Sequence, residues 1–197
     1  RVMRISFSGE LAYEINIEAN YGRYIWDEVA LAGKPWNITP YGTESMHVLR
    51  AEKGYIIVGQ DTDGSMTPMD VNMKWILAKD KPFSYIGRRS FSISALNSDD
   101  RFQLVGLLTK DAHVVLPEGS HIINNKGGSI GYVTSSYFSP ILRRSIAMAQ
   151  LKGGLSKMTE TVLIKIVQEK QGLKEIPCEV SSSVFYDIQG EKVDGNE

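Results

Sequence analysis

The chain has 197 residues, of which 42% are hydrophobic and 23% are charged, proportions that are typical of a soluble globular protein. This length allows one large or two small domains and is too short for an enzyme that carries several cofactors by itself. Twenty-two basic and 23 acidic residues give a formal charge of −1, so charge indicates no nucleic-acid partner and no membrane-surface partner.

The single cysteine and the start of the sequence indicate the cellular compartment and the extent of the polypeptide. Cys178 cannot form an internal disulfide and lacks the companions of a cysteine-rich metal site, so we expect a reducing, cytoplasmic compartment. Because no run of about 18 apolar residues occurs, no membrane-spanning helix is expected. The sequence opens at Arg1 with neither an initiator methionine nor a targeting segment, and we interpret it as a piece of a longer polypeptide.

The first half of the sequence predicts a hairpin followed by two helices. Apolar and polar side chains alternate over residues 13–17, the pattern of a half-buried strand, and residues 2–7 supply a partner strand. Large apolar residues recur at every third or fourth position over residues 21–32, which predicts an amphipathic helix. A second helix is expected over residues 40–53. This order favours an α+β fold over repeated parallel units.

The second half predicts a small β-barrel or sandwich. A polar stretch at residues 94–101 interrupts the apolar patterns and marks a domain boundary. Beyond it, short apolar runs alternate with glycine-rich turns. These runs lie at residues 104–108, 121–123, 130–133, 145–151 and 162–167. We therefore divide the chain into a first domain over residues 1–96, a barrel domain over 101–189 and a frayed tail over 190–197.

No residue pattern indicates a metal site or a catalytic nucleophile. The three histidines have no ligand spacing between them. Asp61, Asp63 and Gly64 resemble the start of a calcium loop but lack its remaining ligands. Cys178 follows Pro177 and is more typical of a small buried residue than of a nucleophile. We therefore assign no metal and no catalytic residue to this chain.

Several long segments together resemble a known family. FSGELAYEI, TPYGTESMHVLRAEKGYIIVGQDTD, TPMD and YIGRRSF resemble, in order and spacing, the C-terminal half of the folate-binding aminomethyltransferase fold, typified by the glycine cleavage system T protein. LVGLL, LPEGS, GYVTSSYFSP and SIAMAQLKGG are similar to that family's C-terminal barrel. Within the family, HVLRAEKG, VGQDTDG and VTSSYFSP are most similar to the alpha-subunit branch of the heterotetrameric sarcosine oxidases. The resemblance implies an α+β fold followed by a small antiparallel β-barrel.

The resemblance also implies a function in one-carbon transfer. In that branch, sarcosine is oxidised at a flavin in a partner subunit, and tetrahydrofolate captures the carbon as 5,10-methylenetetrahydrofolate while glycine is released. The family's catalytic aspartate and the FAD, FMN and NAD sites are expected outside this chain. The expected partners are therefore the missing N-terminal part of the same subunit and the other subunits, and the chain alone is expected to be inactive.

Two other functions remain open beside this one. A glycine cleavage T-protein-like aminomethyltransferase shares the same fold, and a non-catalytic assembly module could keep the fold without the chemistry. A folate-binding branch linked to iron–sulfur and RNA maturation carries a reactive cysteine in a KGCYxGQE-like stretch. The comparable residues 81–89 contain no cysteine, which argues against that branch.

Glu14 is the leading candidate for folate binding. It aligns with the glutamate of the family's YEI segment, which holds the pterin, and an ionised carboxylate can accept both parallel N–H donors of the 2-amino-4-oxopyrimidine edge. Alternation with Tyr13 and Ile15 alone favours a plain glutamate on the exposed face of a strand. The hypothesis requires this carboxylate to face a cleft.

Three further residues complete the candidate folate site. Tyr13 can stack on a pteridine or benzoyl ring. Arg50 matches the LRAE segment, although a structural ion pair is an equally ordinary role for arginine. Tyr137 lies in a stretch that we interpret as a barrel loop approaching the folate. Two departures weaken the match, because Met46 and Phe7 stand where the T protein has an arginine and a tyrosine.

Overall fold

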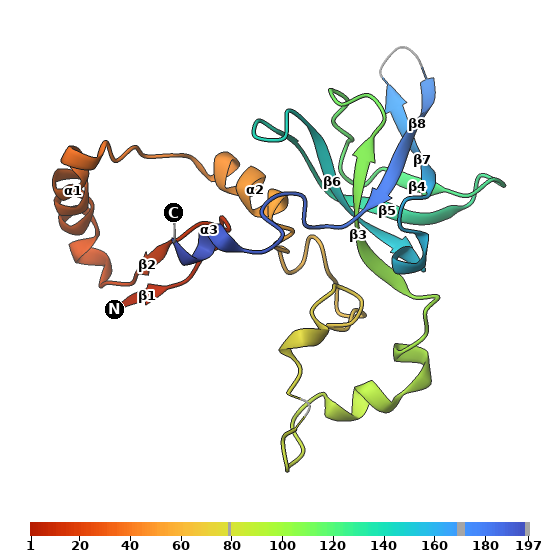
Figure 1. The fold of residues 1–197 in the computed structure, drawn as a ribbon, viewed down its shortest axis with the longest axis horizontal. Coiled ribbons are helices and arrows are strands. Elements are labelled where there is room, and N and C mark those ends of the chain that lie inside the picture. Colours follow the sequence, from red (N-terminus) through yellow and green to blue (C-terminus); the bar gives the residue numbers. More distant parts are fainter. Residues whose placement is uncertain (79, 169–171, 196–197) are drawn as a thin grey trace.

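A computed structural model describes residues 1–78, 80–168 and 172–195, and Figure 1 shows their arrangement. The second half closes into a β-barrel, whereas the first half runs outward from the barrel as a series of short elements joined by extended chain (Figure 1). The helix α2 lies where the two halves meet. No helix among the described residues is long and apolar enough to cross a membrane.

The first half contains the expected hairpin and two helices. Strands β1 (Val2–Arg4) and β2 (Tyr13–Ile15) pair antiparallel, with Met3 opposite Glu14. Helix α1 (Gly22–Gly33) follows. Helix α2 (Thr43–Glu52) begins three residues later than the sequence predicts, because the backbone remains extended up to its N-cap. The hairpin and both helices are thus confirmed, with a shorter second helix.

The segment between α2 and the barrel has little regular structure. Its described part contains an isolated β-bridge between Val58 and Thr62 and short 3₁₀ helices at Lys74–Ile76, Arg88–Ser92 and Ser94–Leu96. Arg101 joins this segment to the barrel, since its guanidinium donates to both carboxylate oxygens of Asp70, with the closest distance 2.8 Å. Although burial acts to raise the pKa of Asp70, the hydrogen bonds from Arg101 and Thr67 leave it below its ordinary value.

Six antiparallel strands form the closed barrel, in the order β3-β6-β5-β4-β7-β8 with β8 paired to β3. The strands are β3 (Phe102–Thr109), β4 (His121–Ile123), β5 (Ser129–Ser139), β6 (Arg144–Lys152), β7 (Thr161–Gln168) and β8 (Gly172–Ser181). The expectation of an α+β fold ending in a small antiparallel barrel is confirmed. Closure leaves the barrel without unpaired edge strands, because each strand has a neighbour on both sides.

Apolar side chains that alternate along the strands fill the barrel. Val105, Leu151 and Ile164 are buried in this core, together with Cys178. Burial raises the pKa of the Cys178 thiol to about 12, which keeps it protonated and unreactive near neutral pH. A second cluster, formed by Ala51, Val71, Leu104, Ile146 and Met148, lies where α2 packs on β5 and β6.

Three local predictions were wrong. Strand β8 is absent from the predicted strands, because Pro177 and its charged neighbours hide the alternation of Ile176, Cys178 and Val180. Tyr137 and its neighbour belong to β5 rather than to a loop, since pairing with β6 continues as far as Ser139. The frayed tail is instead a short helix, α3 (Glu191–Asp194), over much of its length, and residues 196 and 197 lie outside the described residues.

Candidate functional site

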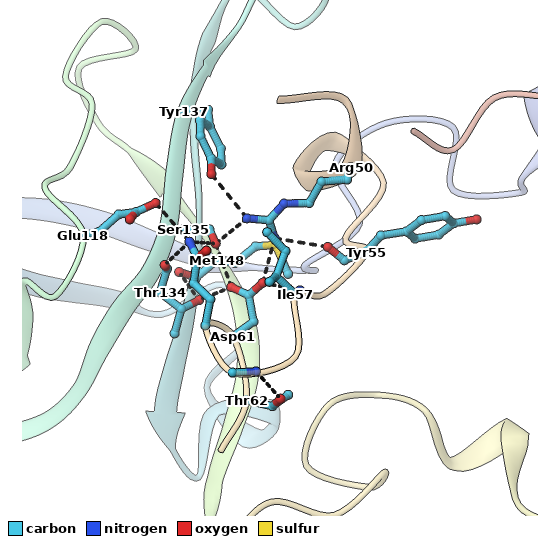
Figure 2. A network of polar contacts seen from close by, with 12 residues as sticks. Arg50, Tyr55, Ile57, Asp61, Thr62, Glu118, Thr134, Ser135, Tyr137 and Met148 are labelled. Atoms are coloured by element: carbon cyan, nitrogen blue, oxygen red, sulfur yellow. Dashed lines mark hydrogen bonds and ion pairs between the residues drawn. The ribbon is translucent and has the colours of Figure 1, made fainter. Parts of the chain in front are cut away.

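Arg50 lies in a buried polar network between α2 and the barrel (Figure 2). One terminal nitrogen donates to Asp61 Oδ2 at 2.7 Å and to the backbone carbonyl of Tyr55 at 3.1 Å. The other donates to Ser135 Oγ at 2.6 Å and to the hydroxyl of Tyr137 at 3.3 Å. The guanidinium also lies 5.6 Å from the centre of the Tyr137 ring, within the range of a cation–π contact. Both terminal nitrogens of Arg50 are therefore held by this protein's own groups.

Asp61 completes the network from the other side. Its Oδ1 accepts hydrogen bonds from Thr134 Oγ1 at 2.5 Å and from Ser135 Oγ at 2.7 Å, while the backbone N–H of Ile57 donates to its Oδ2 at 2.8 Å. The side chains of Arg50 and Asp61 are both fully buried. A buried charge pair with this many hydrogen bonds is suited to joining two parts of a structure, and it leaves the carboxylate little capacity for a ligand.

One acidic residue, Glu52, and one basic residue, Lys53, lie at the C-terminal end of α2. Ser139 Oγ donates to Glu52 Oε1 at 2.5 Å. Burial raises the pKa of the Glu52 carboxyl; the hydrogen bond from Ser139 acts in the opposite direction, and the carboxylate of Glu10 raises the pKa further. Lys53 pairs with Asp187 at 2.6 Å and, mainly by that hydrogen bond, lowers the pKa of the Asp187 carboxyl. The first contact connects α2 with β5, and the second connects the end of α2 with residues that follow the barrel.

Glu14 and Tyr13 lie on the exposed hairpin. Successive side chains of a strand point to opposite faces, so the two residues face opposite sides of β2. Tyr13 is 60% exposed, and the exposed Glu14 accepts one hydrogen bond, from Asn16 Nδ2 at 3.1 Å. Glu14 does not line the hollows beside α1, beside residues 69–103 or beside Leu11 in the described part of the chain. These hollows therefore do not supply the cleft that the hypothesis requires.

The structure brings together only half of the predicted folate residues. Arg50 and Tyr137 are in contact, at the junction of α2 and β5. Among the described residues, no hydrogen bond, ion pair or ring contact joins Glu14 or Tyr13 to them. The predicted contact of these four residues with folate is not tested by this arrangement and stays a prediction.

Sequence reasoning missed the partners of Arg50. The sequence patterns present Asp61 as an incomplete calcium ligand and as part of a resembling segment, and Thr134 and Ser135 only as part of another such segment. A signal was present, because the stretch Thr134–Ser136 places consecutive hydroxyls between apolar residues of a strand. Buried hydroxyls need partners, and here two of them bind the carboxylate of Asp61.

Other parts of the described chain offer limited chemistry. A mostly apolar hollow of about 490 Å³ lies between α1 and residues 38–41, with Trp26, Val29 and Tyr41 in its lining. Within the described ranges, no group of three or more histidine, cysteine, aspartate or glutamate side chains is arranged to hold a metal ion. This hollow offers ring stacking and apolar contact, without a cluster of charged groups.

Comparisons with family models divide the chain at residues 82–102, which we call the linker. Residues 1–81 match the model of the GCVT N-terminal domain, and residues 103–187 match the model of the glycine cleavage T-protein C-terminal barrel domain. A crystal structure of glycine cleavage system aminomethyltransferase T from Bartonella henselae has the same fold, with a TM-score of 0.81 at 23% sequence identity. That similarity covers 94% of this chain and 49% of the other.

Curated relatives carry two names. The chain is 44% identical, over 99% of its length, to sarcosine oxidase subunit alpha of Corynebacterium sp. (strain P-1), and 36% identical over 98% to the subunit of that name in Rhizobium meliloti (strain 1021). It is 29% identical over 93% of its length to an aminomethyltransferase of Synechococcus sp. (strain CC9311). The chain spans 20% of the length of the two former relatives and 46% of the latter.

Proposed function

Because this chain belongs to the glycine cleavage T-protein family, we propose that it is the C-terminal part of a sarcosine oxidase alpha subunit and supplies part of its tetrahydrofolate site. One observation carries the proposal. The 44% identity extends over 99% of the chain and so includes the linker outside both matched domains, whereas the identity to the aminomethyltransferase is 29%. In the proposed reaction, the carbon of oxidised sarcosine passes to tetrahydrofolate and gives 5,10-methylenetetrahydrofolate and glycine.

The proposed function divides the work between this chain and the rest of the complex. We propose that residues 1–96 form the C-terminal portion of the aminomethyltransferase-like domain and residues 101–189 its barrel. The catalytic aspartate and the flavin and nicotinamide sites lie elsewhere in the complex, so this chain alone is inactive. Cys178 is the only cysteine of the sequence and is buried and free, which supports our proposal of a reducing, cytoplasmic compartment.

Glu14 is the proposed anchor of the pterin. Its carboxylate is exposed and accepts a hydrogen bond from one neighbouring amide, so it can turn to two N–H donors of a ligand. The cleft that the pterin needs must then be completed by the preceding part of the subunit. Length supports this, because the chain covers only 49% of an aminomethyltransferase with the same fold. Tyr13 lies on the same strand but faces its opposite side, so we propose that its aromatic ring contacts folate separately from Glu14.

The folate contact is tested by titrating 5-formyltetrahydrofolate against the full-length alpha subunit. Replacing Glu14→Gln is expected to weaken binding about ten- to a hundredfold, or about 1.5–3 kcal/mol, because one charged and hydrogen-bonded contact is lost. Glu179→Gln, at an exposed position of β8, is the matched control and should leave the affinity unchanged. If Glu14→Gln binds as tightly as the wild type, the assembly-module function is favoured instead.

The first half also presents an apolar surface, which we propose is covered by the preceding part of the subunit. Helix α1 contains no buried residue. Large aromatic side chains on and after it are exposed, among them Tyr24, Trp26 and Trp36. Exposed apolar surface of this kind marks an interaction site. The proposed occupant is the half of the fold that this chain does not span, since the chain covers 49% of a structure with the same fold.

The isolated chain is therefore expected to self-associate through this surface. Its elution from a size-exclusion column should shift to larger sizes as concentration rises, because apolar area is removed from water on association. Trp26→Arg, which charges the surface, should reduce the shift. Trp75→Arg changes a similarly exposed tryptophan in the segment between α2 and the barrel and should have no effect. A wild-type chain that elutes as a monomer at all concentrations contradicts the proposed covering.

A further inference from the structure

The last described residues connect the barrel with the hairpin. After β8 ends at Ser181, the chain leaves the barrel, passes the C-terminal end of α2 and reaches β1 and β2 through α3 (Figure 1). We call residues 182–195 the C-terminal strap. Its two ends contact elements that are far apart in the sequence, so it links the two halves of the chain without being a domain itself.

The first contacts of the strap are with the end of α2. The backbone N–H groups of Phe185 and Tyr186 both donate to the carbonyl of Glu52, at 2.9 Å each. Lys53 Nζ donates to the backbone carbonyl of Asp187 at 2.7 Å and to its Oδ2 at 2.6 Å, and both side chains of this pair are less than 10% exposed. The strap also runs close to Gly54, where a Cβ would lie 2.5 Å from the carbonyl oxygen of Ser183.

The second set of contacts is with the hairpin. The backbone N–H of Leu11 donates to the carbonyl of Lys192 at 3.0 Å, and Arg4 Nη2 donates to the carbonyl of Val193 at 2.8 Å. Arg4 also pairs with Asp194, at 3.4 Å. The N–H groups of Glu191 and Lys192 donate to the carboxylate of Asp187, which fixes the start of α3. One carboxylate thus holds both Lys53 and the turn that presents α3 to the hairpin.

Lys53 contacts the hairpin as well as the strap. Gly9, in the hairpin turn, has a φ of +82°, and a Cβ there would lie 1.9 Å from Cγ of Lys53. The hairpin strands have three residues each and bury no side chain, and such a short hairpin is at best marginally stable by itself. Its position relative to α2 must therefore come from contacts such as these.

We infer that the C-terminal strap is a positioning device, in which Lys53 and Asp187 hold the hairpin in one orientation relative to α2 and the barrel. The hairpin carries Glu14, so the strap sets where the proposed pterin anchor points; this step rests on the proposed function. A preorganised anchor binds more tightly because its ordering does not oppose binding. Lys53 and Asp187 act through the hairpin and do not touch the ligand.

The test uses the full-length alpha subunit and measures amide hydrogen exchange together with 5-formyltetrahydrofolate affinity. Lys53→Met keeps the apolar stem and removes the ammonium. Asp187→Asn is the second variant, because the residue has a φ of +48°, a conformation that asparagine tolerates. Lys152→Met removes the lysine of an exposed pair with Asp100 and is the matched control.

The amide of Leu11 is the direct reporter, since its hydrogen bond is made only when the strap is docked. Both variants are expected to speed its exchange on the order of tenfold or more, while barrel amides such as those of Val105 and Ile164 stay unchanged. Folate affinity is expected to fall at least about threefold with Glu14 intact, because the anchor is no longer preorganised. The control should change neither quantity.

Three outcomes would overturn the inference. Unchanged exchange at Leu11 shows that the ion pair does not hold the hairpin, and faster exchange of the barrel amides in step with Leu11 shows general destabilisation. Faster exchange at Leu11 with unchanged folate affinity, in a subunit where Glu14→Gln does weaken binding, shows that the strap does not position the site. If the wild-type subunit binds no folate, the proposed function fails, while Leu11 exchange still decides whether the strap holds the hairpin.

Discussion

Replacing Arg50 with methionine is expected to lower the free energy of unfolding by about 3–5 kcal/mol, because it leaves a buried carboxylate without its cation. Asp61 is completely buried, and its remaining donors in the network of Figure 2 are hydroxyl and backbone groups without charge. Denaturation of wild type and variant in guanidinium chloride, followed by circular dichroism, measures the difference. The loss should be seen without folate, since both terminal nitrogens of the guanidinium are held inside the protein.

Two control variants show whether burial is the cause. Arg23→Met removes the exposed partner of Asp27, whose carboxylate lies 3.6 Å away, and is expected to change stability by less than about 0.5 kcal/mol. Combining Arg50→Met with Asp61→Asn removes both charges and should recover part of the loss. If Arg50→Met costs less than about 1 kcal/mol but removes most of the folate affinity, Arg50 is a ligand residue and the structural role is wrong.

Much of the fold could be predicted because local patterns of apolar residues determine most of its helices and strands. Alternation predicts the strand at Tyr13–Ile15, and spacing of three and four predicts α1, since each pattern follows directly from the geometry of its element. Apolar runs likewise predict most barrel strands. Where buried polar residues or a proline interrupt the apolar pattern, as at Thr134 and Pro177, the same patterns fail, because tertiary contacts rather than local preference fix those strands.

The candidate site was less predictable than the fold. Arg50 and Asp61 are eleven residues apart, but Ser135, which binds both, is 85 residues from Arg50. No spacing rule links residues so far apart, so their meeting depends on how α2 packs against β5. Glu14 is different: its strand was predicted, but its neighbours supply only one hydrogen bond to its carboxylate, from Asn16, and no binding partner. Glu14 was selected through the family resemblance, and its proposed contact with folate can be tested only by measuring ligand binding.

Replacing Ile164 with alanine is expected to lower the free energy of unfolding by about 2–5 kcal/mol, because it opens a cavity in the barrel core. Ile164 is fully buried on β7, opposite Ile122 of β4 and Ile176 of β8. The neighbouring strands are closed into a ring and cannot move inward to fill the space. Val167→Ala, on the same strand at a side chain that is 77% exposed, is the control and should change stability by less than about 0.5 kcal/mol.

The probe used for this measurement matters, because the three tryptophans lie outside the barrel. Trp26, Trp36 and Trp75 are each more than 60% exposed, so their fluorescence should report little of the barrel's unfolding. Circular dichroism in the strand region should instead follow it, and Ile164→Ala should shift that transition to lower denaturant. The apolar core lies within the barrel, and α1 buries no side chain in it. An equal shift at Val167→Ala would show that the barrel core does not dominate the stability of this chain.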